Sequence, residues 1–235
     1  MNLLLFTEQD RTESGLLRIT GRRLQHLLQV HGKAPGEQLK VGELDGLMGS
    51  ARIVSIDENA ALLDPTVGEP PPVKLPLTLL VALPRPKMLR RILRTVAEFG
   101  VGELHLINSY RVEKSFWQTP VLTEQKRYEY LLQGLEQSRD TILPEVHCHR
   151  RFKPFVEDSL PGLLQGRRGL LAHPGDYPPC PRDIGEPTRL AIGPEGGFIP
   201  YEVEKLEAAG CKTVSLGPRI LRVENAVTAL LGRLF

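Results

Sequence analysis

Hydrophobic and polar residues follow two different rhythms along the chain. In residues 36–46 and 47–64, apolar and polar positions alternate and are interrupted by Gly42, Gly46 and the turn at 57–59. This alternation is typical of short antiparallel strands, and residues 21–31 have the spacing of a short helix. The N-terminal part is therefore predicted to be a small β-barrel or sandwich, an architecture that often binds nucleic acid.

A proline-rich stretch separates the two rhythms. Residues 67–76 read VGEPPPVKLP, with four prolines in ten residues and no apolar period. Proline fixes φ and cannot donate a hydrogen bond to a sheet, so we predict a linker here. The expected domains are residues 1–70 and residues 71–235.

Beyond the linker, strands and helices are expected to alternate. Residues 75–83 form a nearly continuous apolar run of the kind that is buried in a parallel sheet. The helix expected at 87–100 places Met88, Leu89, Ile92, Leu93, Val96 and Phe99 at helical spacing and ends at Gly100. Further strands are expected at 103–109, 168–174, 188–194 and 212–218, and further helices at 123–139, 199–210 and 223–235. The pattern predicts an α/β domain with a largely parallel sheet, whose ligands bind beyond the carboxyl ends of the strands.

Composition makes this an ordinary globular chain. Of its 235 residues, 41% are hydrophobic and 25% are charged, and no apolar run approaches the roughly 18 residues of a membrane span. The N-terminal residues lack the features of a signal peptide, so the expected location is the cytoplasm, with no membrane partner. Three scattered cysteines without a CxxC spacing argue against a disulfide framework.

Charge is divided unequally between the two parts. Residues 1–72 carry seven basic and ten acidic side chains, whereas residues 73–235 carry 23 basic and 18 acidic ones. A polyanionic partner would be attracted mainly by the C-terminal part. His147 and His149 flank Cys148 in a pattern that could suggest a metal, but no second ligand pair stands nearby in the sequence. We interpret this stretch as the end of a strand with exposed imidazoles, and we expect no metal.

Two Gly-Pro bends mark the most unusual part of the chain. Residues 190–198 read LAIGPEGGF, and residues 215–226 read SLGPRILRVENA. Gly193 and Gly217 each close an apolar strand, so both loops are expected at the carboxyl edge of the sheet, on neighbouring strand ends. Gly196 and Gly197 lack a Cβ that would block the close approach of a ligand. The stretch LAHPGD at 171–176 is a third loop of this kind.

The loop chemistry favours a neutral ligand. Neither the P-loop pattern with its Gly-Lys-Ser/Thr nor the GxGxxG dinucleotide fingerprint occurs. A loop that is rich in glycine and proline but has no lysine suits an adenosine better than a triphosphate. A tight turn with a purely structural role is the alternative.

These motifs closely resemble those of a known family. The paired stretches AIGPEGGF and LGPRILRVENA are similar to the signature of the ribosomal RNA small subunit methyltransferase E family, within the SPOUT class. Residues 87–101, 136–146 and 171–174 resemble further segments of that family, so that the resemblance covers nearly the whole chain.

The resemblance implies both a fold and an activity. It implies an α/β domain with a deep trefoil knot near the C-terminus, preceded by a PUA-like barrel that binds RNA. The implied reaction is S-adenosylmethionine-dependent methylation of N-3 of a specific uridine in the 16S rRNA of the small ribosomal subunit. The implied assembly is a homodimer whose cofactor pocket lies near the subunit interface.

Such a reaction requires groups that handle a proton. N-3 of uracil must lose its proton to become nucleophilic, so a base or a cation that stabilises the anion is needed. Arg219 and Arg222 supply cations, and Glu224 supplies a carboxylate. We hypothesise that Glu224 orients or deprotonates the base and that Arg222 stabilises the anion. The alternative for Glu224 is a carboxylate that simply stabilises a helix N-terminus, and the same interpretation is preferred for Glu195.

The sequence departs from the family at two places. Many members read Arg-Thr-Glu-Thr-Ala where this chain has Arg222-Val-Glu-Asn-Ala226. A hydroxyl at position 223 or 225 therefore cannot be essential here, and Asn225 can cap the following helix. In the barrel, Gln29 and His31 stand in a segment where the family commonly carries an arginine.

The resemblance also assigns binding residues. The adenosine pocket is expected to be lined by Leu171, Ile192, Gly193, Gly196, Leu216, Ile220 and Leu221. The residues themselves indicate where RNA is contacted, since one face of the helix at 87–100 carries Lys87, Arg90, Arg91 and Arg94. A solvated helix face is the alternative, but no acid stands among residues 85–94, which favours contact with phosphates. In the barrel the expected contacts are Arg11, Arg22 and Arg23.

Two other functions remain open. One is a SPOUT methyltransferase that acts on tRNA or on a ribose 2′-hydroxyl. The other is a non-catalytic rRNA-binding assembly factor, in which the barrel and the basic helix do the binding.

Overall fold

The computed structural model describes residues 2–29 and 34–235 and divides the chain into two compact units. The first unit comprises residues up to Val73 together with Leu132–Leu143, and the second comprises Lys74–Leu131 and Pro144–Phe235. The main division falls within the predicted linker. Residues 132–143 belong to the first unit although they come from the middle of the chain.

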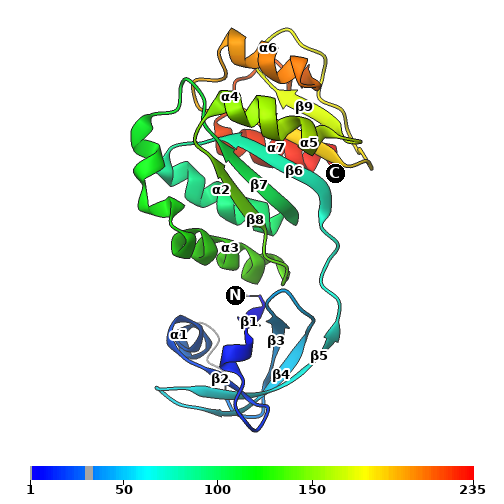
Figure 1. Ribbon diagram of the computed structural model, residues 1–235. Coiled ribbons are helices and arrows are strands. Elements are labelled where there is room, and N and C mark those ends of the chain that lie inside the picture. Colours follow the sequence, from blue (N-terminus) through cyan, green and yellow to red (C-terminus); the bar gives the residue numbers. More distant parts are fainter. Residues whose placement is uncertain (1, 30–33) are drawn as a thin grey trace. The chain divides into compact units, whose positions relative to one another are not determined.

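The first unit is a five-stranded sheet in the order β1-β3-β4-β5-β2 (Figure 1). Its strands are β1 (Leu4–Phe6), β2 (Leu17–Ile19), β3 (Gln38–Glu43), β4 (Met48–Ile56) and β5 (Ala61–Glu69). Three of the four pairings are antiparallel, as predicted, but β1 and β3 run parallel. The order leaves β1 and β2 at its two ends, so the expected barrel is a curled sheet.

One apolar cluster forms the core of the first unit. The alternation predicted for residues 47–64 is observed, since Ala51, Ile53 and Leu63 are buried. Helix α1 (Gly21–Gln29) adds Leu24 and Leu27 to the same cluster. The last two positions of the helix predicted at 21–31, including His31, lie outside the described residues.

Residues 132–143 are tied to the first unit by hydrogen bonds. The Glu136 carbonyl accepts the backbone N–H groups of Asn2 and Leu3, and its carboxylate pairs with Arg22 at 2.6 and 2.9 Å. Thr141 Oγ1 donates to the Gly46 carbonyl at 2.6 Å. The contacts involve residues about a hundred positions apart, which explains why no local pattern predicted them.

The predicted linker is shorter than ten residues in the structure. Strand β5 continues through Glu69, and β6 begins at Leu75. Val67 still pairs with Gly49. The part between the strands is therefore residues 70–74, which contains three of the four prolines.

The second unit is built on a six-stranded sheet in the order β11-β9-β10-β6-β7-β8. Its strands are β6 (Leu75–Ala82), β7 (Val101–Ile107), β8 (Glu145–His149), β9 (Arg168–Ala172), β10 (Thr188–Ile192) and β11 (Cys211–Val214). All five pairings are parallel. The α/β class with a parallel sheet is thus confirmed.

Helices connect these strands as the apolar spacing predicts. The main ones are α2 (Pro86–Glu98), α3 (Glu124–Ser138), α6 (Pro200–Ala208) and α7 (Val223–Leu234), with short turns at α4 (Phe152–Pro154) and α5 (Leu160–Leu164). Helix α2 packs against α7 and β7 through Leu89, Ile92, Leu93 and Val96, whereas Phe99 lies beyond its end and is partly exposed. Helix α6 packs against β9 and β11.

Cys148, Cys180 and Cys211 are all free thiols. Burial raises the pKa of the Cys211 thiol to about 12, so it remains protonated at neutral pH. Among the described helices, none is long and apolar enough to cross a membrane.

The curled sheet provides a test of strand packing at glycine. Alanine at Gly49 would overlap the Thr66 carbonyl oxygen and bring its Cβ within 2.8 Å of Val67 Cα, whereas alanine at Gly68 would meet nothing within 4 Å. We expect Gly49→Ala to lower the free energy of unfolding by about 2 kcal/mol or more, and Gly68→Ala to change it by less than about 0.5 kcal/mol. Urea denaturation followed by circular dichroism measures both. Equal stability of the two variants would contradict this packing.

Candidate functional site

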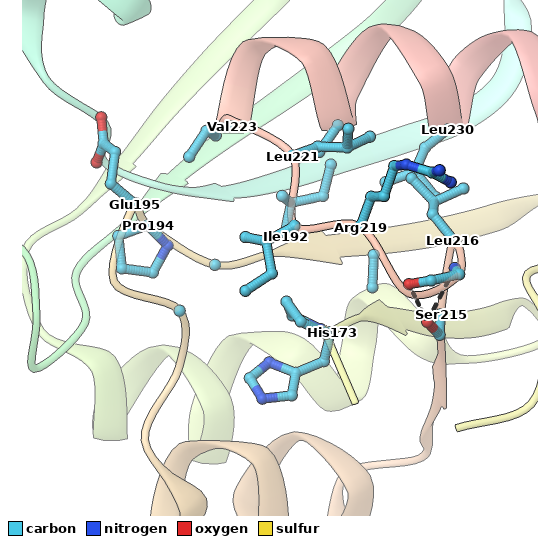
Figure 2. A pocket seen from close by; sticks show the side chains of 17 residues that line it. His173, Ile192, Pro194, Glu195, Ser215, Leu216, Arg219, Leu221, Val223 and Leu230 are labelled. Carbon is cyan, nitrogen blue, oxygen red and sulfur yellow. Dashed lines mark hydrogen bonds between the residues drawn. The ribbon is translucent and has the colours of Figure 1, made fainter. Parts of the chain in front are cut away.

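A pocket opens at the carboxyl ends of β9, β10 and β11. Figure 2 shows Ile192 near its centre, with His173 on one side and Leu221 and Val223 at the start of α7 on the other. Its wall consists of Ala172, His173, Pro174, Ile192, Gly193, Pro194, Glu195, Gly197, Ser215, Leu216, Gly217, Arg219, Ile220, Leu221, Val223, Ala226 and Leu230. All three predicted carboxyl-edge loops therefore meet at one site.

The strand order corrects one part of the prediction. Gly193 follows β10 and Gly217 follows β11, but β9 lies between these two strands. The two bends are therefore not on neighbouring strand ends. They share a pocket because the loop after β9, with His173, completes the wall between them.

The loop after β10 is closely packed, and its glycines are required. A Cβ on Gly193 would lie 3.0 Å from the Phe198 backbone nitrogen, and Gly197 has a φ of +71°. A Cβ on Gly196 would lie 2.8 Å from Arg111 Cδ. The Arg111 guanidinium donates to the Gly196 carbonyl, so this glycine faces the arginine. Close packing of backbone thus shapes this side of the pocket.

The loop after β11 is held by its own serine. The Gly217 N–H donates to Ser215 Oγ at 3.1 Å, and Gly217 adopts a φ of +113°. The next residues reach the rim of the pocket, where the Ile220 side chain is 81% exposed. An apolar side chain on the rim is available to a bound molecule.

The wall combines apolar side chains with few charges. Ile192, Leu216, Leu221, Val223 and Leu230 supply the apolar surface. The loops add backbone donors and acceptors, which is the combination that adenine-type ligands use.

His173 lines the pocket, although it was not predicted as a binding residue. It belongs to the stretch LAHP, which was expected to form a loop at this edge of the sheet. Burial, together with the Arg111 cation, lowers the pKa of His173 below its usual value of 6.5. Its Nδ1 is buried and has no hydrogen-bond partner among the described residues. At neutral pH the imidazole is therefore uncharged, and one of its nitrogens is left without a hydrogen bond.

The predicted cofactor residues fall into two groups. Five of them line the pocket: Ile192, Gly193, Leu216, Ile220 and Leu221. Leu171 instead lies fully buried within β9, one residue before the wall begins. Gly196 lies on the Arg111 side of its loop, and Gly197 takes its place in the wall.

The predicted catalytic pair lies beside the pocket. Arg222 is exposed at the N-cap of α7. Glu224 is buried in the first turn, where its Oε1 lies 3.5 Å from Arg91 Nη1. The other carboxylate oxygen, Oε2, is buried without a hydrogen-bond partner among the described residues. Neither Arg222 nor Glu224 belongs to the wall, although Val223 and Ala226 do.

Glu195 and Arg219 are the ionised side chains in the wall. Glu195 Oε1 accepts the backbone N–H of Arg85 at 3.0 Å, at the start of α2. Its carboxylate therefore stabilises that helix N-terminus, as the sequence suggested for Glu195 in general terms. Figure 2 shows the carboxylate turned away from Ile192 and His173.

The four predicted basic residues lie on α2, but they differ in their exposure and in their partners. Lys87 and Arg90 are exposed. Arg91 pairs with Glu224, and the Arg94 guanidinium lies 4.9 Å from the centre of the Tyr130 ring. Lys87, Arg90 and Arg91 are thus the exposed cations of this face, and Arg91 is also paired with Glu224.

The three predicted arginines of the first unit are engaged in ion pairs. Arg11 contacts Glu8 and Glu43, Arg22 contacts Glu136, and Arg23 contacts Asp10 at 2.6 Å. Burial alone would raise the pKa of Asp10, but the hydrogen bond from Arg23 lowers it below its usual value. These arginines stabilise the first unit, and the Arg22 side chain remains 56% exposed.

A second hollow, which the sequence did not reveal, lies beyond β7 and β8. Its wall includes Tyr110, Trp117 and Tyr201 together with Lys114, Arg150 and Lys153. Tyr110 is 80% exposed, and Arg150 lies 5.4 Å from the centre of the Trp117 ring. Aromatic rings interleaved with cations are typical of surfaces that bind single-stranded nucleic acid. We call this hollow the aromatic groove.

The Glu202 carboxylate stabilises the aromatic groove by accepting three hydrogen bonds. This buried side chain in α6 accepts the Tyr110 N–H at 2.8 Å, the Ile199 N–H at 3.1 Å and the Ser109 hydroxyl at 3.2 Å. It thereby joins the loop after β7 to the start of α6. Its first-turn position also favours a negative charge.

We expect Glu202→Ala to lower the free energy of unfolding by about 2 kcal/mol, because three donors lose their acceptor in a buried place. Glu204→Ala, an exposed position on the same helix, is the matched control and should change stability by less than about 0.5 kcal/mol. Thermal and urea unfolding of both variants measure the difference. A Glu202→Ala variant as stable as the control would show that these contacts contribute nothing.

Comparisons with known proteins agree with this architecture. A family model described as "RNA methyltransferase domain" matches residues 71–234. The "Ribosomal RNA small subunit methyltransferase E" of Treponema pallidum is 30% identical over 241 residues, which cover 97% of this chain and 88% of that protein.

Solved structures show the same fold over almost the entire chain. A methyltransferase from Legionella pneumophila, solved in complex with SAM, superposes with a TM-score of 0.74 at 22% identity and covers 98% of this chain and 95% of that one. A ribosomal RNA small subunit methyltransferase E from Neisseria gonorrhoeae, bound to S-adenosyl methionine, gives a TM-score of 0.71 at 20% identity, with 98% and 95% covered.

The resemblance inferred from the two Gly-Pro motifs is thus confirmed. The family model covers the second unit with its pocket, and the Treponema relative extends the match through the curled sheet. This chain belongs to the ribosomal RNA small subunit methyltransferase E family and carries its RNA methyltransferase domain.

Proposed function

We propose that this protein is an S-adenosylmethionine-dependent methyltransferase that methylates N-3 of a specific uridine in the 16S rRNA of the small ribosomal subunit. The observation that carries the proposal is the apolar, glycine-walled pocket at the carboxyl ends of β9, β10 and β11 in a chain of this family. The Legionella and Neisseria structures of the same fold hold S-adenosylmethionine.

The pocket fits this cofactor better than it fits a nucleoside triphosphate. Ile192, Leu216 and Leu221 would hold the adenosine, and the Gly193–Gly197 loop would contact it through backbone groups. The cofactor supplies a methyl group that its positive sulfonium already activates. An uncharged His173 and a single cation, Arg219, suit such a positive ligand, whereas a triphosphate requires several cations.

The chain itself must handle the proton on N-3 of the uracil. In the proposal Glu224 orients or deprotonates the base, and Arg222 stabilises the developing anion. The start of α7 supports this assignment, since Val223 and Ala226 line the pocket and Glu224 keeps one buried oxygen without a partner. Arg91 contacts the other oxygen and so orients the Glu224 carboxylate.

RNA is proposed to contact the second unit at two places. Lys87 and Arg90 on α2 face solvent and would contact phosphates. In the aromatic groove, Tyr110 would stack on a base while Lys114 and Lys153 contact phosphates. In the first unit, Arg11, Arg22 and Arg23 would have to exchange a carboxylate for a phosphate, and Arg22 is the most exposed of them.

A trefoil knot is part of the proposal. After β11 pairs with β9 at one edge of the sheet, the chain returns to α7, which packs against α2 and β10. The loop after β9 contacts the end of α7, because the Ile184 N–H donates to the Leu234 carbonyl and Arg233 Nε donates to the Cys180 carbonyl. These contacts are consistent with a knot in which α7 passes through the loop that follows β9. The curled sheet would correspond to a PUA-like barrel.

A homodimer in the cytoplasm completes the proposal. Ile220 and Leu221 are exposed apolar residues on the rim of the pocket, which a second subunit would cover. Two other functions predict different results. Methylation of tRNA or of a ribose 2′-hydroxyl would label another nucleoside, and a non-catalytic assembly factor would not bind S-adenosylmethionine at millimolar concentration.

The catalytic assignment is tested with two matched substitutions. Glu224→Gln should lower the rate of methyl transfer to 30S subunits by about a hundredfold or more, because the carboxylate charge is lost. Glu195→Gln, at the other carboxylate beside the pocket, should retain most of that rate. The substrate is 30S subunits from a strain that lacks the enzyme, with labelled methyl donor and saturating cofactor.

Calorimetry must show that both variants bind S-adenosylmethionine as the wild type does. Under that condition, a normal rate for Glu224→Gln would refute its role. No methyl transfer to 30S subunits by the wild type would refute the proposed function itself.

The neutral His173 leads to a prediction about pH. Its pKa lies below 6.5, so the imidazole is uncharged at pH 7 and gains a proton as the pH falls below that value. We expect S-adenosylmethionine to bind about fivefold more weakly once acid pH has protonated His173 than at pH 7, since roughly 1 kcal/mol separates two nearby cations from a cation and a neutral group. Calorimetry of the wild type and of His173→Gln measures this effect.

Two comparisons isolate the cause. The dependence on pH should disappear in His173→Gln, and it should be smaller for S-adenosylhomocysteine, which lacks the sulfonium charge. The same dependence in wild type and His173→Gln would contradict the assignment.

A further inference from the structure

A cluster of histidines and carboxylates lies on β7 and β8, at the edge of the second unit's sheet that is opposite to β11. The register pairs Glu103 with Glu145 and His105 with His147. Because alternate residues of a strand point to the same face, these four side chains and His149 share one face of the sheet. The second ligand pair missing near His147 in the sequence is supplied by β7.

The polar atoms of this cluster are close together. Glu103 Oε1 lies 2.9 Å from His105 Nε2 and 3.6 Å from His147 Nε2. Each of Glu103, His105 and His147 offers one ligand atom, and these three atoms all lie within 4.8 Å of one another. Around a tetrahedral zinc ion, neighbouring ligand atoms lie about 3.3 Å apart, given bonds of about 2.0 Å. A rotation of the His147 side chain, which is 43% exposed, closes the remaining gap.

The buried His105 and the partly buried Glu103 already have the outer partners that metal ligands require. His105 Nδ1 lies 2.8 Å from His149 Nε2, so a metal on Nε2 would leave the Nδ1 proton for His149. Glu103 Oε2 accepts the Thr78 hydroxyl at 2.7 Å. Such contacts fix the tautomer of a ligating imidazole and the orientation of a ligating carboxylate.

We propose that Glu103, His105 and His147 form a binding site for one divalent transition-metal ion, of which zinc is the expected occupant. Two imidazoles and one carboxylate form a donor set that zinc accepts readily. The fourth position would be taken by water or by Glu145, whose Oε2 lies 3.4 Å from His147 Nε2. The Phe155 ring lies 4.5 Å from the His149 ring and shields that side of the cluster.

One charge opposes metal binding and limits its strength. Arg189 is buried on β10, and its positive charge acts on both Glu103 and His105. The alternative role for Glu103 is that of counter-ion to this arginine. The two roles make different predictions, since a counter-ion alone does not create a saturable metal site.

A metal at this place would join the edge strand β8 to β7. The sheet order places β10, which carries the pocket, two positions from β7 and three from β8. The inference is therefore independent of the methyl-donor pocket, and metal binding should raise the thermal stability of the protein without being required for cofactor binding.

The test is a titration of tag-free, chelator-treated, full-length protein with zinc chloride, followed by calorimetry. We expect one zinc ion per chain and a rise in melting temperature. Cobalt(II) in place of zinc should give visible absorption bands of a four-coordinate site. Glu103→Gln and His147→Gln should each weaken zinc binding by at least about tenfold.

The control is Cys148→Ser, because Cys148 lies on the same strand but on the opposite face and is an alternative zinc ligand. It should bind zinc as the wild type does. His147→Gln alters an accessible side chain, so the test does not depend on the folding of a variant at a buried position. The proposal is overturned by the absence of a saturable site, by unchanged affinity in both cluster variants, or by loss of binding in Cys148→Ser.

Discussion

Strand β10 is the element on which the rest of the second unit depends. All five of its residues are buried, and it pairs in parallel with β9 on one side and β6 on the other. The register sets Ile192 opposite both Ala172 and Val81. Because these strands end at the same level, the loops that follow β9 and β10 leave the sheet together and enclose a pocket.

Few charges lie in the wall of this pocket, where Glu195 and Arg219 are the charged side chains. The wall is otherwise mainly apolar, with an uncharged His173, and so suits a positively charged methyl donor. The contact between Arg91 and Glu224 joins the basic face of α2 to the start of α7. The first turn of α7 thus belongs both to the wall of the pocket, through Val223 and Ala226, and to the contact with the basic face of α2.

Local patterns predicted the elements and part of the site, while long-range pairings escaped prediction. Apolar spacing located most of the strands but not β1 and β2, and the Gly-Pro motifs, with the family resemblance that they carry, located the pocket and five of its wall residues. The insertion of β9 between β10 and β11, the attachment of residues 132–143 to the first unit, and the meeting of Glu103 with His147 all depend on partners far apart in the chain. Glu202 escaped prediction because three donors from separate segments define its role.

The most direct test of the account is mass spectrometry of 16S rRNA nucleosides from a strain in which this gene is deleted. The account predicts that one N3-methyluridine disappears and that it returns when the wild-type protein is supplied. Digestion with a base-specific ribonuclease locates the modified position in the same measurement. An unchanged set of methylated uridines in the deletion strain, or loss of a ribose methylation in place of a base methylation, would contradict it.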